Sequence, residues 1–138
     1  MTPDLPSTGV KGLGGVFLYA ENPEALSRWY GQHFGLAFIE WEPGTCYGLE
    51  FPYTDPDGQA AHTVFSLMKA KAPLGEGRPE CVVNWRVADL EAFCARLEAA
   101  GVPVEKREDY DYGRFAWIRD PEGRRVELYQ PLQAPGTF

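Results

Sequence analysis

Glu127 is the residue of this chain whose type and position are best suited to chemistry. It lies in a predicted strand at residues 124–130, where apolar and polar side chains alternate, so it points away from the face that Val126 and Leu128 give to the core. In an aromatic surrounding that excludes water, such a carboxylate is suited to act as a general base on an acidic C–H. The alternative is a strand glutamate held by a cross-strand arginine or by solvent.

Asn84 and Arg86 share a polar face in the same way, in a strand predicted at residues 81–87. A guanidinium binds a carboxylate or phosphate through two parallel hydrogen bonds, so Arg86 with Asn84 is a candidate ligand-binding pair. Otherwise Arg86 partners an acid such as Glu127. Arg114 is the weaker candidate, since strict alternation puts it on the core side of its strand.

Aromatic side chains are abundant, with four Trp, seven Tyr and eight Phe. Several of them fall on the polar faces of predicted strands, where they would line a binding site for an apolar or planar small molecule. Others among them are expected to serve as core. The candidates are Phe17, Tyr19, Phe115, Trp117 and Tyr129.

His62 is the second candidate for catalysis or metal binding. It lies four residues after Gly58, as Glu127 lies four residues after Gly123, so the two occupy matching places in a repeat. A slip of two residues in this strand would place Val64 there instead, and a slip of four would place Ser66 there. The alternative is a surface histidine just past a hairpin turn. The other histidine, His33, is expected on the outer part of a helix.

That repeat organises the whole chain. Tyr47-Gly48 is followed by Asp55-Pro56-Asp57-Gly58, and Tyr112-Gly113 by Asp120-Pro121-Glu122-Gly123, in matching order. The sequence therefore predicts a single domain over 1–138, built from modules 14–69 and 80–131 that are joined by a linker at 70–79. A cleft between the two modules would bind a small molecule.

Each module is predicted to be a strand, a helix and three further strands, which is an α+β arrangement. Asn22 and Asp89 are predicted to cap the helices, and Gly35 and Gly101 to end them. Glu108, Asp109 and Asp111 are expected to form a solvated loop. The predicted strands cover 16–20, 36–41, 47–53, 62–68, 81–87, 102–107, 112–119 and 124–130.

The composition limits the partners and the compartment. A net charge of −7 over 138 residues argues against nucleic-acid binding and is compatible with a cationic or neutral small ligand. No apolar run approaches the roughly 20 residues of a membrane span, and no secretory signal is apparent. The three cysteines form no C-x-x-C pair. We therefore expect a soluble cytoplasmic protein with reduced thiols.

Three segments carry a resemblance to the vicinal oxygen chelate superfamily, the group of glyoxalase I, bleomycin-resistance proteins, extradiol dioxygenases and methylmalonyl-CoA epimerase. They are Gly14–Tyr19, the helix from Pro23 to Tyr30 that closes in Phe34-Gly35-Leu36, and Asp120-Pro121-Glu122-Gly123 followed by Val126-Glu127-Leu128. The resemblance spans residues 14–131. It implies two βαβββ modules that form a curved mixed sheet around a ligand cleft, and a homodimer.

The resemblance also implies metal ligands from the first and fourth strands of each module. The matching positions hold Glu127, His62, Gly15 and Val82, and the last two have no side chain that binds a metal. One histidine and one carboxylate leave most of a coordination shell to water. No cofactor is firmly implied, and Zn, Ni, Mn or Fe would bind weakly.

Two functions follow as expectations. The first is a binding protein of the glyoxalase/bleomycin-resistance type, which sequesters a small amphipathic ligand in an aromatic-lined cleft. The second is an isomerase or lyase acting next to a carbonyl, with Glu127 as general base and His62 or a weakly bound metal stabilising the enolate. A ring-cleaving dioxygenase is disfavoured because the sequence offers no set of two histidines and one carboxylate.

Overall fold

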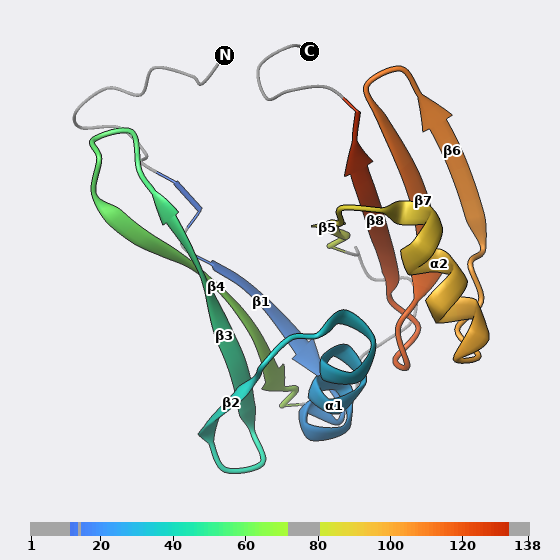
Figure 1. Ribbon diagram of the computed structural model, residues 1–138. Coiled ribbons are helices and arrows are strands. Elements are labelled where there is room, and N and C mark those ends of the chain that lie inside the picture. Colours follow the sequence, from blue (N-terminus) through green and yellow to red (C-terminus); the bar gives the residue numbers. More distant parts are fainter. Residues whose placement is uncertain (1–11, 14, 72–80, 133–138) are drawn as a thin grey trace. The chain divides into compact units, whose positions relative to one another are not determined.

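The computed structural model describes residues 12–13, 15–71 and 81–132, and within these ranges it contains two helices and eight strands (Figure 1). In chain order they are β1 (Gly15–Ala20), α1 (Pro23–Phe34), β2 (Ile39–Glu42), β3 (Cys46–Thr54), β4 (Ala60–Lys69), β5 (Val83–Arg86), α2 (Leu90–Ala99), β6 (Lys106–Tyr110), β7 (Gly113–Arg119) and β8 (Arg125–Pro131).

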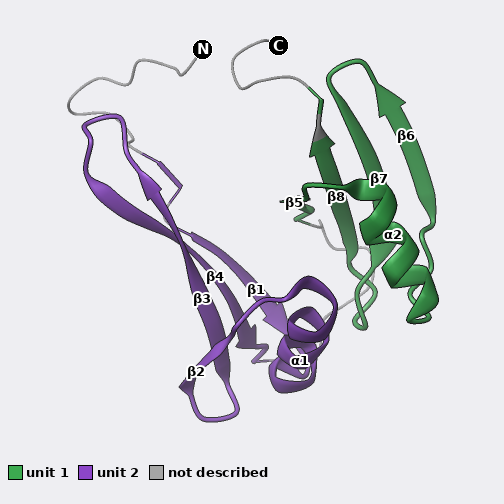
Figure 2. Ribbon diagram, in the orientation of Figure 1, with its two compact units in different colours: residues 1–2, 77–138 green, residues 3–76 purple. Residues whose placement is uncertain are grey.

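The chain divides into two compact units, which Figure 2 shows in different colours. The N-terminal unit, residues 3–76, holds α1 and a sheet of order β1-β4-β3-β2. The C-terminal unit, residues 77–138 with 1–2, holds α2 and a sheet of order β5-β8-β7-β6. Each unit is thus a βαβββ module with a mixed sheet, which confirms the predicted α+β fold. Most of the predicted linker, residues 72–79, lies outside the described residues.

Each helix covers one face of its own sheet, and the core of each unit lies between them. In the C-terminal unit, α2 contacts β7 and β8, and the side chains that point toward it are fully buried, Ala116, Ile118 and Leu128 among them. In the N-terminal unit, Phe65 and Leu67 of β4 are buried on the side of α1. The facing predicted from period-2 alternation is therefore confirmed, and each sheet has a second face that its helix does not cover. We call this second face the open face.

The N-caps of both helices and the end of α1 are as predicted, whereas the C-cap of α2 is Ala100, and the predicted Gly101 follows it with a φ of +85°. The Asn22 side chain accepts a hydrogen bond from the backbone N–H of Ala25, and Asp89 accepts one from Ala92. Gly35 ends α1 with a φ of +69°, in the left-handed region that favours glycine. His33 differs from expectation, because it is buried: it continues the stripe of buried residues along α1 and packs against the ring of Trp29.

The strand predicted at 102–107 begins later than expected. The backbone N–H of Val102 donates to Leu97, which makes Val102 part of the end of α2 and buries its side chain. Strand β6 consequently starts at Lys106 and includes Glu108 and Asp109, which were expected to lie in a loop. A similar delay after α1 moves the strand predicted at 36–41 to Ile39–Glu42.

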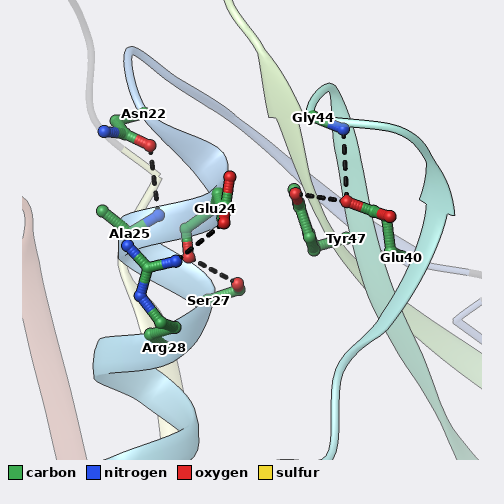
Figure 3. A network of polar contacts seen from close by, with 8 residues as sticks. All are labelled: Asn22, Glu24, Ala25, Ser27, Arg28, Glu40, Gly44 and Tyr47. Carbon is green, nitrogen blue, oxygen red and sulfur yellow. Dashed lines mark hydrogen bonds and ion pairs between the residues drawn. The ribbon is translucent and has the colours of Figure 1, made fainter.

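A hydrogen bond between the side chains of Tyr47 and Glu40 connects the two strands of the β2–β3 hairpin, as Figure 3 shows. The Tyr47 hydroxyl donates to Glu40 over 2.7 Å, and the backbone N–H of Gly44 donates to the same carboxylate. The bond from Tyr47 lowers the pKa of Glu40, and the bond to Glu40 raises the pKa of Tyr47 to about 12. This hairpin therefore depends on a neutral phenol beside a charged carboxylate.

The repeated turn motif is built more tightly in the C-terminal unit. Asp55 and Asp120 each accept two backbone hydrogen bonds within their turns. Asp120 is buried, however, and lies 3.6 Å from the guanidinium of Arg124, which is buried as well. The two turns have the same shape, but the second encloses a buried ion pair.

Candidate functional site

Six of the nine candidate residues come together on the open face of the C-terminal sheet. The strand register places Glu127 between Asn84 of β5 and Trp117 of β7. Two residues further along β8, on the same face, Tyr129 lies between Arg86 and Phe115. Residues far apart in the sequence thus lie side by side in two neighbouring sets of three across the sheet, because parallel β5 and antiparallel β7 both pair with β8.

The aromatic side chains of this face form a nearly parallel set of rings. The ring centroid of Phe115 is 4.9 Å from that of Tyr129 and 6.1 Å from that of Trp117, with interplanar angles of 25° and 16°. Tyr110 and Tyr112 stack on each other at 5.4 Å, and both meet Phe115 edge-on. We call Phe115, Trp117 and Tyr129 the aromatic row. Its rings are half-buried, so they give the open face a rigid apolar surface.

Glu127 is held at this row by two uncharged donors. The Asn84 amide donates to its Oε2 over 2.7 Å, and the Trp117 indole N–H donates to its Oε1 over 3.1 Å. Each oxygen therefore accepts one hydrogen bond, and the carboxylate has a fixed orientation. An oriented carboxylate can accept a further hydrogen bond from a ligand, since each of its oxygens has two acceptor sites.

Cations surround Trp117. The Lys106 ammonium lies 5.5 Å and the Arg125 guanidinium 5.4 Å from the centroid of the indole ring. Lys106 also forms an ion pair with Glu108 over 2.8 Å, and Tyr110 donates a hydrogen bond to Glu108. The contact with Lys106, followed by that with Tyr110, lowers the pKa of Glu108.

The structure keeps Arg114 away from this site, as the alternation predicted. Arg114 pairs in register with Gln130, whose side chain accepts a hydrogen bond from the backbone of Leu90 in α2. This position therefore lies on the helix side of the sheet.

The other three candidates belong to the N-terminal unit. Phe17 and Tyr19 lie on the open face of its sheet, with exposed fractions of 55% and 48%. His62 is exposed on the same face, and its Nδ1 lies 3.5 Å from the Glu50 carboxylate. A single site that combines these residues with the aromatic row stays a prediction.

The register corrects the equivalence that the repeat suggested for His62. Phe17 of β1 corresponds to Asn84 of β5, since each lies five residues before its helix cap. Phe17 pairs with Ser66, whereas Asn84 pairs with Glu127. Ser66, rather than His62, therefore occupies the place in the first module that Glu127 occupies in the second.

These residues do not fit a tightly held metal. Glu127 accepts N–H donors at both oxygens, and Ser66, Gly15 and Val82 stand at the related positions. In the described parts of the chain, no three His, Cys, Asp or Glu side chains gather in a way that could hold an ion. The donor set is thus poorer than structural or catalytic sites normally require.

Sequence reasoning missed three contributors to the open face, namely Lys106, Arg125 and Gly113. The first two follow the same alternation as Trp117 and Glu127, but the strand of Lys106 was misplaced. Gly113 matters because a Cβ there would lie 2.5 Å from Cε1 of Tyr129. Its signal was present in the sequence, as a glycine two residues before Phe115 in the same strand.

Comparison with known proteins identifies the family. The chain belongs to the Glyoxalase/Bleomycin resistance protein/Dioxygenase superfamily, whose model matches residues 12–128. Over 46 residues it is 46% identical to a lactoylglutathione lyase of Pseudomonas putida, which covers 33% of this chain and 27% of that protein. The matched segment therefore spans about a quarter of the curated relative.

Solved structures share the fold over nearly the whole chain. TnmS3, an antibiotic binding protein from Streptomyces sp. CB03234, is 26% identical, with a TM-score of 0.64 over 88% of this chain and 97% of that one. A lactoylglutathione lyase from Agrobacterium tumefaciens is 21% identical, with a TM-score of 0.63 over 91% and 94%. Neither helix of the described chain is long and apolar enough to cross a membrane.

Proposed function

We propose that this protein binds a planar aromatic small molecule on the open face of the C-terminal sheet and sequesters it. The observation that carries the proposal is the aromatic row, in which Phe115 lies nearly parallel to both Trp117 and Tyr129 beside an oriented carboxylate. Aromatic side chains fixed by their neighbours bind planar ligands at a low entropic cost, because little is left to be ordered on binding.

The similarity to an antibiotic binding protein supports the same class of function. Glu127 adds polarity to the row, since it can accept a hydrogen bond from a hydroxyl or amine of the ligand. An amphipathic ligand with a flat apolar body and a polar edge matches this combination. The proposal includes contacts of Phe17, Tyr19 and His62 with the ligand.

A titration of the wild-type protein with 2-naphthamide, followed by calorimetry, tests the proposal. We expect binding, and we expect Phe115→Ala to weaken it about tenfold or more, since stacking on one aromatic side chain contributes roughly 1–3 kcal/mol. Phe93→Ala is the matched control, because Phe93 lies on α2, the element that covers the other face of the sheet. Absence of binding, or an equal loss in both variants, would contradict the proposal.

The second candidate is an isomerase or lyase that acts next to a carbonyl. The oriented Glu127 carboxylate favours it, and so does the local similarity to a lactoylglutathione lyase. Glu127 would take the proton from the carbon beside the carbonyl and return it to a neighbouring position. Exchange of that hydrogen for solvent deuterium in a bound aromatic ketone, followed by NMR, detects this step.

Glu127→Gln separates the two functions. The Asn84 amide can turn so that its oxygen accepts from the new glutamine, which preserves the shape of the site. Sequestration should then persist within a few-fold, whereas proton exchange should fall by orders of magnitude. The homodimer implied by the family also stays a proposal, and light scattering on the purified protein tests it.

A further inference from the structure

We propose that the ligand of this site carries an anionic group and that Arg86 binds it, which makes the ligand a planar aromatic acid. This inference rests on the proposed function and adds the chemical class of the ligand. Arg86 is exposed on the open face, in register with Tyr129 of the aromatic row. Its guanidinium therefore lies at the border of the surface on which the ligand would stack.

The first argument is that no acid of the described chain neutralises Arg86. Its nearest carboxylate in the strand register is Glu127, on the neighbouring strand. The hydrogen bonds that the Glu127 oxygens accept within the described chain come from Asn84 and Trp117, so the alternative in which Arg86 pairs with Glu127 is not the arrangement found there. Among the described residues, the side chain of Arg86 makes no ion pair or hydrogen bond. Its donors are thus available to a ligand.

The second argument is the balance of charge on the open face. The acids there are already engaged: Glu108 pairs with Lys106, and Glu127 accepts two N–H donors. Arg86 has no acidic partner within the described residues, whereas Arg125 lies over the Trp117 ring and interacts electrostatically with Glu108. The chain as a whole carries a net charge of −7, whereas Lys106, Arg86 and Arg125 outnumber Glu108 and Glu127 by one on this face, which makes the face a local exception. Such a face attracts anions by long-range electrostatics.

The geometry of a guanidinium narrows the class of anion. Its planar fork matches the two oxygens of a carboxylate, or two oxygens of a phosphate or sulfonate, through parallel hydrogen bonds. A flat acid can stack on the aromatic row and present its charged group to Arg86 at the border. The shared chemistry is an anionic oxygen group joined to an aromatic ring system, and a carboxylate is the form tested below.

Calorimetry with 2-naphthoate and 2-naphthamide tests the assignment, because these probes have nearly the same shape and differ in charge. We expect the wild-type protein to bind naphthoate at least tenfold more tightly than naphthamide at low salt. The preference should shrink as the salt concentration rises. Arg86→Gln should remove the preference, because it weakens the binding of naphthoate far more than that of naphthamide, while Arg86→Lys should keep part of the preference.

Arg96→Gln is the matched control, since Arg96 is an exposed cation of the same unit on α2, stacked over Phe93. It should leave both affinities unchanged. Equal binding of the two probes by the wild-type protein would overturn the inference and leave the proposed function standing. An unchanged preference in Arg86→Gln, or an equal loss in Arg96→Gln, would overturn the role of Arg86. Binding of neither probe would contradict the proposed function itself.

Discussion

Gly113→Ala should destabilise this protein, although the same change usually stabilises a strand. Glycine in a strand interior is typically worse than alanine by about 0.5–1 kcal/mol, because it loses more backbone freedom on folding. At Gly113, however, an added Cβ would lie 2.5 Å from Cε1 of Tyr129 and 3.2 Å from the backbone oxygen of Gln130. Carbon atoms pack at about 3.5–4.0 Å, so the Tyr129 ring must move by about 1 Å.

The loss of stability follows from the stacking contact that the Tyr129 ring gives up when it moves. Tyr129 stacks on Phe115 at 4.9 Å, and a pair of aromatic rings contributes roughly 0.5–1.5 kcal/mol beyond its buried area. Overpacking of a filled position costs a further ~1–3 kcal/mol. After the gain in backbone entropy is subtracted, we expect a net loss of about 1–3 kcal/mol in the free energy of unfolding. Urea denaturation measures it.

A double-mutant cycle identifies the cause. In a Tyr129→Ala background the obstructing ring is gone, so Gly113→Ala should become neutral or stabilising. A Gly113→Ala protein as stable as the wild type would refute the reasoning. An equal loss in both backgrounds would also refute it, because the backbone of Gln130 and not the ring would then be responsible.

Three further predictions concern other parts of the molecule. Asp120→Ala should lower the free energy of unfolding by about 2–3 kcal/mol, against about 1 kcal/mol for Asp55→Ala, because only the first removes one of the two acids that pair with a buried arginine, Glu122 at 3.9 Å being the other; urea denaturation of both variants checks this. The raised pKa of Tyr47 stabilises the folded protein fully below pH ~10, and this stabilisation is lost as the pH rises toward 12. Between these pH values the melting temperature of the wild type should therefore fall more steeply than that of Tyr47→Phe, which has no phenol to ionise. Trp117→Phe removes the indole N–H that Glu127 accepts and should cost about 0.5–1.5 kcal/mol in urea denaturation, whereas an unchanged stability would show that this hydrogen bond is not formed in solution.

The sequence predicted correctly which face of the sheet each side chain lies on, but it predicted the first residues of the strands less well. Alternation depends only on parity, so Val126, Glu127 and Leu128 were assigned to the correct faces without knowledge of any partner strand. The start of β6 was missed because Val102 and Val104 have strand-forming side chains, whereas the backbone of Val102 completes the end of α2. Local preference was overridden there by the cap of the preceding helix.

The sequence predicted which site residues share a face of the sheet, but not the hydrogen bonds between them. Asn84 and Glu127 could be placed on one face from the sequence, yet their direct hydrogen bond depends on a register between strands 43 positions apart. For the same reason the sequence left open whether Arg86 or another group would hold Glu127. The helical spacing was taken to put His33 on the outer part of α1, although it lies three residues beyond the buried Tyr30 and is itself buried.

The longer hairpin of the N-terminal unit bears on how a duplicated module can change in length. Ser66 lies eleven residues after Asp55, while its counterpart Glu127 lies seven after Asp120. Their partners Gly48 and Trp117 lie seven and three residues before the same turn positions, so each arm of the first hairpin is longer by four. Four is even, so each strand is lengthened by about 13 Å without turning any side chain to the opposite face. An insertion of one residue in the same arm would turn Phe65 and Leu67 to the open face and their neighbours Val64 and Ser66 toward α1. Length variation in this hairpin is thus restricted to even steps, and relatives with odd differences there must carry a bulge that restores the phase.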